Sequence, residues 1–317
     1  MCNTLIMIKI TNGTYNILRH ANKPEMAEKD FLECLILEKL FNDAYFSENF
    51  VFAGGATLSK TYQLSNRICQ DLDLVCSCFD DIPDNHSRKQ LDKFKRRFKH
   101  TVFTDICAKI NDVINRDNQF KIMTDADWGA LKNKETFISS PTLHILYASN
   151  FCKNVGHLSL EIIPRKYKTA NIIEHRTVIP YAISQEFGDI PTVRYEQTFW
   201  DKVYALHSNT ISPRPHFTQF YSRHYHDVAK LAHYVDLHGT LSMLDDIESF
   251  QNKYTLKRIP KLHTFNELQL APCFSDLEKL QNDYIQMSDK FLGTPTNWQD
   301  IIQTLRELKA YLRTIQR

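Results

Sequence analysis

The chain has 317 residues, which is enough for two domains at roughly 100–200 residues each. Hydrophobic residues make up 43% of it and charged residues 24%, and this balance excludes the collagen-like, low-complexity and disordered classes of protein. The formal net charge of +2 excludes a globally basic or acidic protein, so any affinity for nucleic acid must come from a local patch.

The composition also bears on location. The 8 cysteines form no C-x-x-C pair, and their scatter along a long chain is typical of reduced thiols in a cytosolic protein. The apolar stretch at residues 5–7 is interrupted by Lys9 and is too short for a signal peptide. Because no apolar run approaches the ~18 residues of a membrane span, we expect a soluble, cytoplasmic protein without a membrane partner.

The first half of the chain is predicted to mix helices and strands, and the second half to be helical. In chain order, the periodicity predicts a helix over 26–43, a strand over 50–53, a short helix over 56–64, a strand over 71–76, a long amphipathic helix over 87–115, and strands at 120–125, 142–149 and 157–163. Helices are then predicted over 198–209, 218–237, 241–252, 274–290 and 296–315. We therefore expect an α+β protein, with a mixed-sheet domain over residues 1–194 followed by an α-helical bundle domain over residues 195–317.

Glycine is scarce, yet two glycines are adjacent. Only 8 residues are glycine, where average usage of about 7% would give roughly 22. Gly54 and Gly55 stand between a predicted strand and a predicted helix, where a backbone without Cβ atoms lets an anion reach the amide groups. The next predicted strand begins Asp71-Leu72-Asp73, and residues two apart on a strand point to the same face. Two such carboxylates repel each other unless a cation such as Mg²⁺ lies between them.

Each of these patterns is common alone, since a D-x-D pair can be a solvated strand edge and Gly-Gly a simple turn. Their order, with a strand before and after, favours a nucleotide site in which the glycine turn meets the phosphates and the acids hold a metal. Any phosphate contact at the glycines would rely on backbone amides, because no serine accompanies them.

Four motifs of the sequence resemble those of one family. They are Glu28-Lys-Asp-Phe31, then Phe52-Ala-Gly-Gly-Ala-Thr-Leu-Ser-Lys60 with Arg67-Ile-Cys-Gln-Asp-Leu-Asp-Leu74, then Thr198-Phe-Trp-Asp-Lys-Val-Tyr-Ala-Leu-His207, and Ser222-Arg-His-Tyr-His-Asp227. They resemble, in this order, the AbiEii/AbiGii toxin-type nucleotidyltransferases, a bacterial branch of the polymerase-β-like nucleotidyltransferase superfamily. The resemblance spans roughly residues 28–235 and implies that the mixed-sheet domain is the nucleotidyltransferase domain. The chain departs from the family pattern at Ala56, which separates Thr57 from the glycines, and at Cys69, where serine is usual.

The resemblance implies a role for each matching residue. Asp71 and Asp73 would bind the metal ions, Mg²⁺ or Mn²⁺, that bridge the phosphates of a nucleoside triphosphate. Such sites usually recruit a third acid from a later strand, and Glu161 is the candidate because its apolar neighbours face the other way; the alternative for Glu161 is an exposed strand carboxylate. Asp227 would assist catalysis by orienting or deprotonating the attacking hydroxyl. The implied nucleotide-binding residues are Gly54, Gly55, Thr57, Lys60, Lys202 and Arg223.

The residues around Lys202 and Asp227 also single out these two positions. Both lie in the predicted helical bundle domain, which would contribute them to the site. Asp227 lies one turn before Leu231 on the apolar side of its predicted helix, so its carboxylate needs a cation or a hydrogen-bond partner. Arg223 is then either a nucleotide contact or only a structural salt-bridge partner of Asp227. Lys202 is either a phosphate contact or a surface lysine whose stem covers apolar residues.

The predicted helix over 87–115 carries a dense run of basic residues, namely Arg88, Lys89, Lys93, Lys95, Arg96, Arg97, Lys99 and His100. The run is either a solvated helix face or a patch that contacts RNA phosphates with salt-dependent affinity. Six of the 13 histidines lie between residues 207 and 238. That segment has no cysteine, and His224 and His226 would point about 200° apart on a helix, which disfavours a zinc site.

These features predict a metal-dependent nucleotidyltransferase that moves a nucleoside monophosphate from a nucleoside triphosphate to an acceptor hydroxyl and releases pyrophosphate. The resemblance implies an RNA acceptor such as the 3′ end of tRNA, and a role as the toxin of a toxin–antitoxin or phage-defence system with a cognate antitoxin. Two alternatives stay open, which are nucleotide transfer onto a protein hydroxyl and a non-catalytic nucleotide- or RNA-binding module. The sequence does not choose the nucleotide, the oligomeric state or the role of the helices over 241–315.

Overall fold

The computed structural model describes residues 8–69, 71–79, 86–132, 140–153, 155–169, 171–212, 215–254 and 265–315. The chain divides into two compact units. The first contains Met1–Thr61, Cys69–Lys166 and Ile173–Val193, and the second contains Tyr62–Ile68, Tyr167–Ile172 and Arg194–Arg317. Two short segments of the first 194 residues thus belong to the unit that holds the C-terminal helices, which the periodicity does not reveal.

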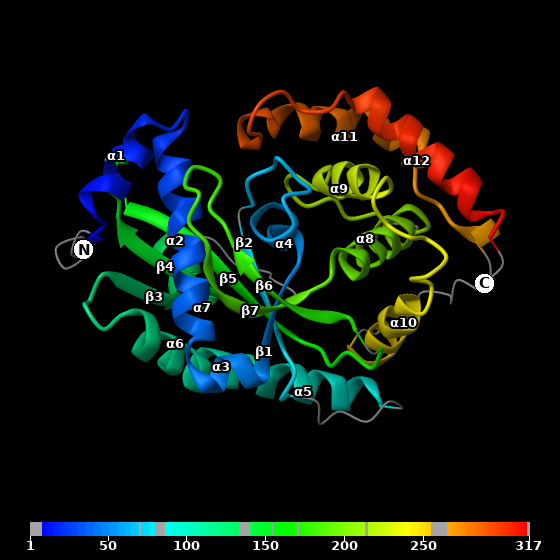
Figure 1. The fold of residues 1–317 in the computed structure, drawn as a ribbon. Coiled ribbons are helices and arrows are strands. Elements are labelled where there is room, and N and C mark those ends of the chain that lie inside the picture. The colour runs from blue at the N-terminus through cyan, green and yellow to red at the C-terminus, as the bar shows by residue number, and fades with distance from the viewer. Residues whose placement is uncertain are drawn as a thin grey trace. The chain divides into compact units, whose positions relative to one another are not determined.

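One mixed seven-stranded sheet organises the first unit (Figure 1). Its strands are β1 (Phe50–Ala53), β2 (Asp71–Cys76), β3 (Phe120–Thr124), β4 (Thr142–Ala148), β5 (Val155–Pro164), β6 (Ile173–Val178) and β7 (Phe187–Val193). They lie in the order β3-β4-β5-β2-β1-β7-β6, with β1–β7 and β2–β5 parallel and the other neighbouring pairs antiparallel. The mixed sheet confirms the predicted α+β class, and β1 and β2 confirm the strands predicted over 50–53 and 71–76.

The central strands bury one face of this sheet. Leu72 and Leu74 on β2, and Leu158, Leu160 and Ile162 on β5, are each at most 1% exposed. They alternate with polar residues along each strand, so the two-residue period directs the polar side chains to the other face. The sequence pattern therefore fixes which side of the sheet is core and which side is left for chemistry.

The helices of the first unit are α1 (Asn12–His20), α2 (Pro24–Phe41), α3 (Ala44–Asn49), α4 (Gly55–Lys60), α5 (Arg88–Thr101), the π-helical turn η1 (Val102–Ile106), α6 (Cys107–Ile114) and α7 (Asp125–Lys132). Helix α2 packs against β5, β7 and α6. The helix predicted over 87–115 is confirmed as a continuous run through α5, η1 and α6. The short helix predicted over 56–64 starts one residue earlier and ends at Lys60. The periodicity misses α1, α3, α7, β6 and β7.

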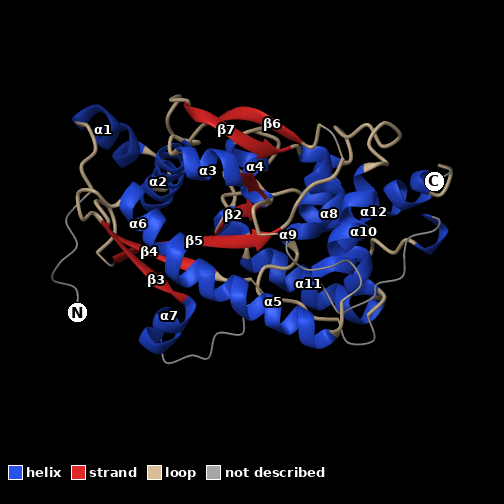
Figure 2. Cartoon of the chain, turned by 90° about the horizontal axis from the view of Figure 1, so that it is seen from below, coloured by secondary structure: helices blue, strands red, loops and turns tan. Residues whose placement is uncertain are grey.

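The second unit is built from helices, drawn blue in Figure 2. They are α8 (Tyr195–Thr210), α9 (Arg223–Leu231), α10 (Met243–Tyr254), α11 (Phe274–Gln286) and α12 (Trp298–Leu312), with short 3₁₀ turns η2 (Phe265–Glu267) and η3 (Ser288–Lys290). Helix α9 packs against α8 and α12, and α10 packs against α8. Helix α9 is shorter than the predicted 218–237, because turns flank it on both sides.

The segment Tyr62–Ile68 is held in the second unit by backbone hydrogen bonds. The amide of Ile68 donates to the carbonyl of Lys290 at 2.8 Å, and the amide of Leu292 donates to the carbonyl of Asn66 at 2.8 Å. These bonds fix Arg67, which lies between Asn66 and Ile68 and forms a β-bridge with Phe291. Across the described ranges, no helix is both long and apolar enough to cross a membrane.

Candidate active site

Three acidic side chains share one face of the sheet in the first unit. Strands β2 and β5 pair in parallel, with Asp73 opposite Glu161 and Asp71 opposite Ser159. Residues opposite each other on neighbouring strands point to the same face, and such strands lie only about 4.8 Å apart. Asp71, Asp73 and Glu161 therefore gather on the face opposite the buried leucines, and each is partly exposed. The register thus places on one face the three residues that the sequence predicts as metal ligands, and their role as ligands stays a prediction.

Gly54 lies at the turn between β1 and α4, directly against Asp73. Its φ is +76°, a backbone conformation that L side chains rarely adopt. A Cβ atom at this position would lie 1.7 Å from Oδ2 of Asp73, so any side chain would displace the carboxylate. The antiparallel pairing of Ala53 with Asp73 produces this close approach. The sequence attributes the glycine pair to the approach of a phosphate, whereas the group that approaches Gly54 here is the carboxylate of Asp73. Gly55 is the first residue of α4.

Two further residues with a predicted nucleotide contact have partners inside the first unit. Thr57 is 0% exposed, and its hydroxyl donates to the carbonyl of Gly54 at 2.8 Å, which closes the turn. Lys60 is 1% exposed, and its ammonium forms ion pairs with Asp30 and, at 2.8 Å, with Oε2 of Glu33. Burial alone would lower the pKa of Lys60, but Asp30 and Glu33 raise it well above 10.5, so the lysine stays charged. Contacts that hold α4 in place therefore account for both side chains.

A second charged cluster forms in the second unit around Asp227, which is 0% exposed. Its carboxylate accepts hydrogen bonds from Arg67, with Nε at 3.4 Å and Nη2 at 3.0 Å. Nζ of Lys202 lies 3.0 Å from Oδ2, and Nδ1 of His226 lies 3.1 Å from Oδ1. The structure thus brings Lys202 and Asp227 together, and it adds Arg67 and His226, to which the sequence assigns no role.

The surroundings of Asp227 decide what this carboxylate can do. Burial alone would raise its pKa, but Arg67, Lys202 and His226 outweigh burial and hold the pKa well below 3.8. The carboxylate therefore stays ionised and paired with these cations. The predicted role of Asp227, to orient or deprotonate the attacking hydroxyl, stays a prediction.

Arg223 is not the partner of Asp227. It is the first residue of α9, and its Nη1 donates to the carbonyls of Gln219 at 3.4 Å and Phe220 at 3.5 Å. The salt bridge to Asp227 that sequence reasoning allows for Arg223 is not formed, because Arg67 and Lys202 take up that carboxylate. Arg67 could have been found in the sequence, since it is the one cation of the stretch Arg67–Leu74, which contains Asp71 and Asp73.

A third cluster shares the sheet face of the acids and was missed in the sequence. His144 on β4 lies opposite Ser159 of β5, so it points to the same side of the sheet as the acids. Nε2 of His144 lies 3.2 Å from Oδ1 of Asp125, and its Nδ1 lies 3.0 Å from Nε2 of His157. The indole of Trp128 stacks on both imidazoles, with ring centroids 4.9 and 4.3 Å apart. In the sequence, only the presence of His144 and His157 on two predicted strands hints at this cluster. The spacing of the two histidines along the chain does not show that they contact each other.

Comparison with known proteins decides the family. The family described as nucleotidyl transferase AbiEii toxin, type IV toxin–antitoxin system, matches residues 35–306. The chain belongs to this family. The resemblance seen in the motifs is confirmed, and this AbiEii protein is a nucleotidyl transferase toxin of a type IV toxin–antitoxin system.

Two solved structures from Helicobacter pylori are similar to the AbiEii chain over nearly its whole length. JHP933 shares 16% sequence identity with it at a TM-score of 0.46, over 96% of this chain and 94% of that chain. A second structure, provisionally described as a nucleotidyltransferase, shares 15% identity at a TM-score of 0.45, over 96% of both chains. Among curated proteins, none matches the chain.

The acids of this AbiEii protein suit a hard divalent cation. Carboxylate oxygens are the ligands that Mg²⁺ prefers, and the ion is usually held by one or two carboxylates plus substrate phosphates rather than by a cage of protein ligands. Within the described ranges, His, Cys, Asp and Glu side chains form no group of three that could hold a metal by themselves. Asp71, Asp73 and Glu161 are of the ligand type that suits such a cation, and a bound ion would need further ligands, such as the phosphates of a nucleotide.

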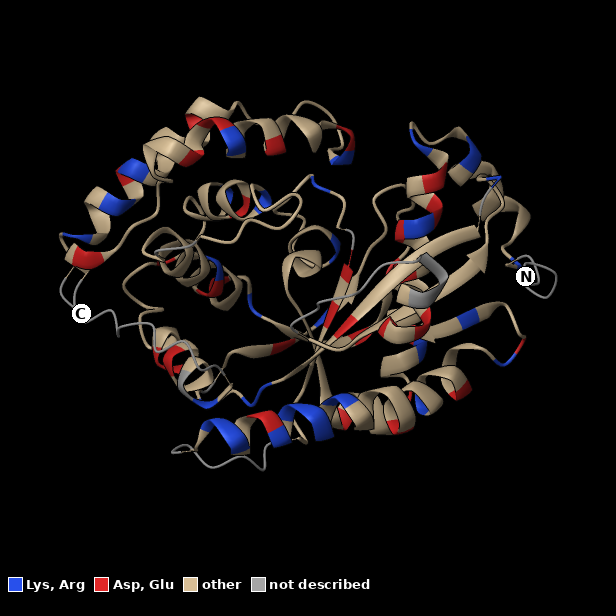
Figure 3. Cartoon of the chain, turned by 180° about the vertical axis from the view of Figure 1, so that it is seen from behind, with Lys and Arg blue, Asp and Glu red and all other residues tan. Residues whose placement is uncertain are grey.

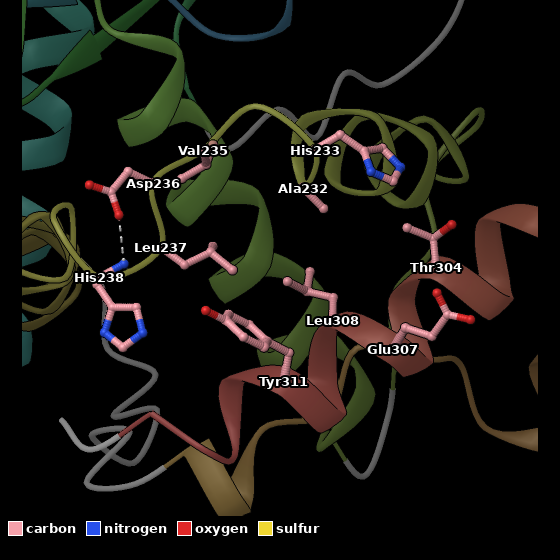
Figure 4. Close-up of a pocket in the computed structure, with 10 residues that line it drawn as sticks. All are labelled: Ala232, His233, Val235, Asp236, Leu237, His238, Thr304, Glu307, Leu308 and Tyr311. Atoms are coloured by element: carbon pink, nitrogen blue, oxygen red, sulfur yellow. Dashed lines mark hydrogen bonds between the residues drawn. The ribbon is translucent and has the colours of Figure 1, made fainter.

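A pocket of about 430 Å³ opens in the second unit of the AbiEii protein (Figure 4). Leu237, Leu308 and Tyr311 point toward its centre, and His233 and Glu307 lie at its edge. None of the residues that the sequence predicts to bind the nucleotide or the metal is among its lining residues. We therefore do not assign the nucleotide to this pocket.

Proposed function

We propose that this AbiEii protein transfers a nucleoside monophosphate from a nucleoside triphosphate to a hydroxyl of RNA, with the 3′ end of tRNA as acceptor. The observation that carries the proposal is the register that sets Asp73 opposite Glu161 and leaves Asp71 on the same face. The acceptor oxygen attacks the α-phosphorus, a new P–O bond forms, the bond to the β-phosphate bridge oxygen breaks, and pyrophosphate leaves. The proton of the hydroxyl passes to solvent.

In this proposal the first unit holds the reacting phosphates. Asp71, Asp73 and Glu161 would bind Mg²⁺ or Mn²⁺, which when bound neutralises charge on the phosphate oxygens. Gly54 keeps the carboxylate of Asp73 in position, because a side chain at Gly54 would collide with it. Thr57 and Lys60 support the turn and α4 from inside rather than contact the nucleotide.

The second unit supplies positive charge in this proposal. Lys202 stands in the family motif over 198–207, and we assign it to the nucleotide phosphates. Asp227 acts as a positioning residue that holds Lys202 and Arg67 in fixed geometry, which the two ion pairs at 3.0 Å support. No base is assigned, because positioning and charge neutralisation carry most of phosphoryl transfer. Arg223, which has only backbone partners for its guanidinium among the described residues, remains the second proposed nucleotide contact.

The test uses the purified chain, each of the four α-³²P-labelled nucleoside triphosphates in turn, Mg²⁺ or Mn²⁺, and total cellular RNA. We expect label in the tRNA band, and loss of that label with Asp71→Asn or Glu161→Gln. Glu174→Gln is the matched control, because Glu174 is a strand glutamate on β6 that pairs with Arg176. Label that never enters RNA, or that survives Asp71→Asn unchanged, would overturn the proposal.

The same experiment separates the alternative acceptors. Label in a polypeptide band would assign the acceptor to a protein hydroxyl, and triphosphate binding without pyrophosphate release would leave only a binding module. The family adds an antitoxin as a partner, and we propose that antitoxin and toxin act together in the cytoplasm, where they would also serve in phage defence. Co-expression with the neighbouring gene, followed by the labelling assay, tests that pairing.

A further inference from the structure

Helix α5 presents a ridge of basic side chains to solvent. Lys89, Lys93, Arg96 and His100 are exposed, and their spacing of four, three and four residues places them in one row along the helix. The opposite side of the helix carries Leu91, Phe94 and Phe98, which are at most 2% exposed. Figure 3 shows the basic residues of α5 in blue. The row covers about 16 Å at 1.5 Å per residue.

The charge of this helix stands apart from that of the rest of the chain. Between residues 88 and 100 there are seven lysines and arginines and a single acid, Asp92, so the segment carries +6. Because the whole chain carries +2, the remaining residues together carry −4. The net positive charge of the chain therefore comes from α5, and most of the lysines and arginines elsewhere are offset by acids.

Three exposed basic residues of α5 have no acidic partner among the described residues. Among the described residues, the charged pair on this helix is Arg88 with Asp92, at 4.0 Å and with both side chains exposed; Lys89, Lys93 and Arg96 form no ion pair. Like charges three or four residues apart on a helix destabilise it, and Lys89–Lys93 and Lys93–Arg96 are two such pairs. Asp92 is the one acid of α5 at such a spacing, three residues after Lys89 and four before Arg96, so it offsets only part of this repulsion.

The first turn of α5 also carries charges that are unfavourable for a helix. The first turn contains no acid and instead contains Arg88 and Lys89, although the positive end of the helix dipole favours acids there. The helix is started by a capping box, in which the amide of Gln90 donates to Oγ of Ser87 at 3.3 Å and the amide of Ser87 donates to Oε1 of Gln90 at 2.7 Å. Both the row of cations and the helix dipole thus offer positive potential at one surface, at the expense of helix stability. Sequences break such local rules mainly where function requires it.

We propose that the ridge formed by Lys89, Lys93, Arg96 and His100 binds the phosphate backbone of the RNA acceptor; the choice of RNA rests on the proposed function. Phosphate contacts of this kind carry no sequence readout, and they position the nucleic acid. A membrane surface fits less well, because an interfacial helix inserts its apolar side chains and those of α5 are buried in the first unit.

The test measures binding of total tRNA to the full chain without nucleoside triphosphate or metal, at salt concentrations from 50 to 200 mM. The variant is Lys89→Gln with Lys93→Gln and Arg96→Gln, and the control removes the same charge from three exposed residues elsewhere in the first unit, Arg116→Gln with Lys121→Gln and Lys153→Gln. We expect the ridge variant to bind about tenfold or more weakly, and the slope of log affinity against log salt to fall by about 2 to 3. We expect the control to change both values much less.

The outcomes separate this inference from the proposed function. Equal weakening by the ridge and control variants, or no weakening by either, overturns the ridge as an RNA surface even if wild-type protein still labels RNA. Wild-type protein that neither binds nor labels RNA overturns both. Loss of binding to vesicles of phosphatidylserine and phosphatidylcholine with RNA binding unchanged would assign the ridge to a membrane instead. Misfolding is excluded by the Tm of the ridge variant, which we expect to equal or exceed that of wild type because like-charge repulsion is relieved.

Discussion

Two buried lysines stand in motifs of the same family, but their surroundings differ in charge. Lys60, in the first unit, faces the carboxylates of Asp30 and Glu33. Nζ of Lys29 lies 3.8 Å from Oε1 of Glu33, so among the described residues two cations meet two acids and their charges balance. A balanced cluster has no charge to offer to a phosphate, and it stabilises the contact between α4 and α2.

Lys202, in the second unit, shares a single carboxylate with another cation. Asp227 pairs with both Lys202 and Arg67 at 3.0 Å, so these three side chains, counted among the described residues, carry one positive charge in excess. Excess positive charge with little water around it attracts an anion strongly. A buried lysine in a nucleotide-binding motif is therefore able to bind a phosphate only if its neighbours leave its charge uncompensated.

The largest effect is expected from removing the shared carboxylate. Asp227→Ala leaves Arg67 and Lys202 buried without a counter-charge, and we expect the free energy of unfolding to fall by about 3–5 kcal/mol. Urea unfolding measures the loss. The control is Asp112→Ala, which removes an exposed acid from α6. Equal unfolding midpoints for the two variants would show that Asp227 does not hold the second cluster together.

Replacement of Lys202 and replacement of the Lys60 cluster should have different effects on the rate of nucleotidyl transfer. Lys202→Met leaves Asp227 paired with Arg67, so the chain should fold, but the phosphates lose a charge, and we expect the rate of nucleotidyl transfer to drop by about 10²-fold or more. Replacing the first cluster as a whole, by Lys60→Met with Asp30→Asn and Glu33→Gln, removes charge without leaving any unpaired. We expect this triple variant to keep its transfer rate per folded molecule. The reverse ranking would mean that Lys60, rather than Lys202, serves the nucleotide.

The sequence predicts the elements of the site better than their partners. The acids of β2 and the face they share follow from the two-residue period of Asp71-Leu-Asp73, and Glu161 follows from the same period on β5. Which strand lies beside which is set by the sheet order, and spacing along the chain does not determine it. The pairing of Asp73 with Glu161 is therefore a result of the structure.

The partners of the two lysines are long-range contacts, which explains why periodicity misses them. Asp30 belongs to α2, thirty residues before Lys60, and Arg67 belongs to a short segment that joins the second unit 160 residues before Asp227. Strand β6 is missed for a different reason, since four of its six residues are polar or charged and its hydrophobic alternation is weak. Local patterns carry little information on such edge strands.

Substitution of Gly54 tests whether the position of the Asp73 carboxylate in the first unit matters for transfer. Gly54→Ala and Gly293→Ala both place a side chain at positive φ, +76° and +87°, and each should lose about 1–3 kcal/mol of stability from backbone strain. A Cβ at Gly54 would collide with Asp73, whereas at Gly293 it would meet nothing within 4 Å. We therefore expect Gly54→Ala to abolish nucleotidyl transfer and Gly293→Ala to retain it. Full transfer by folded Gly54→Ala protein would mean that the position of the Asp73 carboxylate is not critical.

The smallest effect, and the sharpest contrast, is expected in the pH dependence of stability. The pKa of Asp227 is depressed in the folded state, so its contribution is fully present above 3.8 and is lost as pH falls through the folded value. The pKa of Lys60 is raised, so its contribution is fully present below 10.5 and is lost as pH rises through the folded value.

The difference in unfolding free energy between wild type and Asp227→Asn should thus shrink only below pH 3.8, by up to about 1.4 kcal/mol per pH unit. The difference between wild type and Lys60→Met should shrink only above pH 10.5. A constant Asp227→Asn difference down to about pH 2 would mean that Arg67 and Lys202 do not stabilise the ionised carboxylate, and the charge excess of the second cluster would then lose its basis.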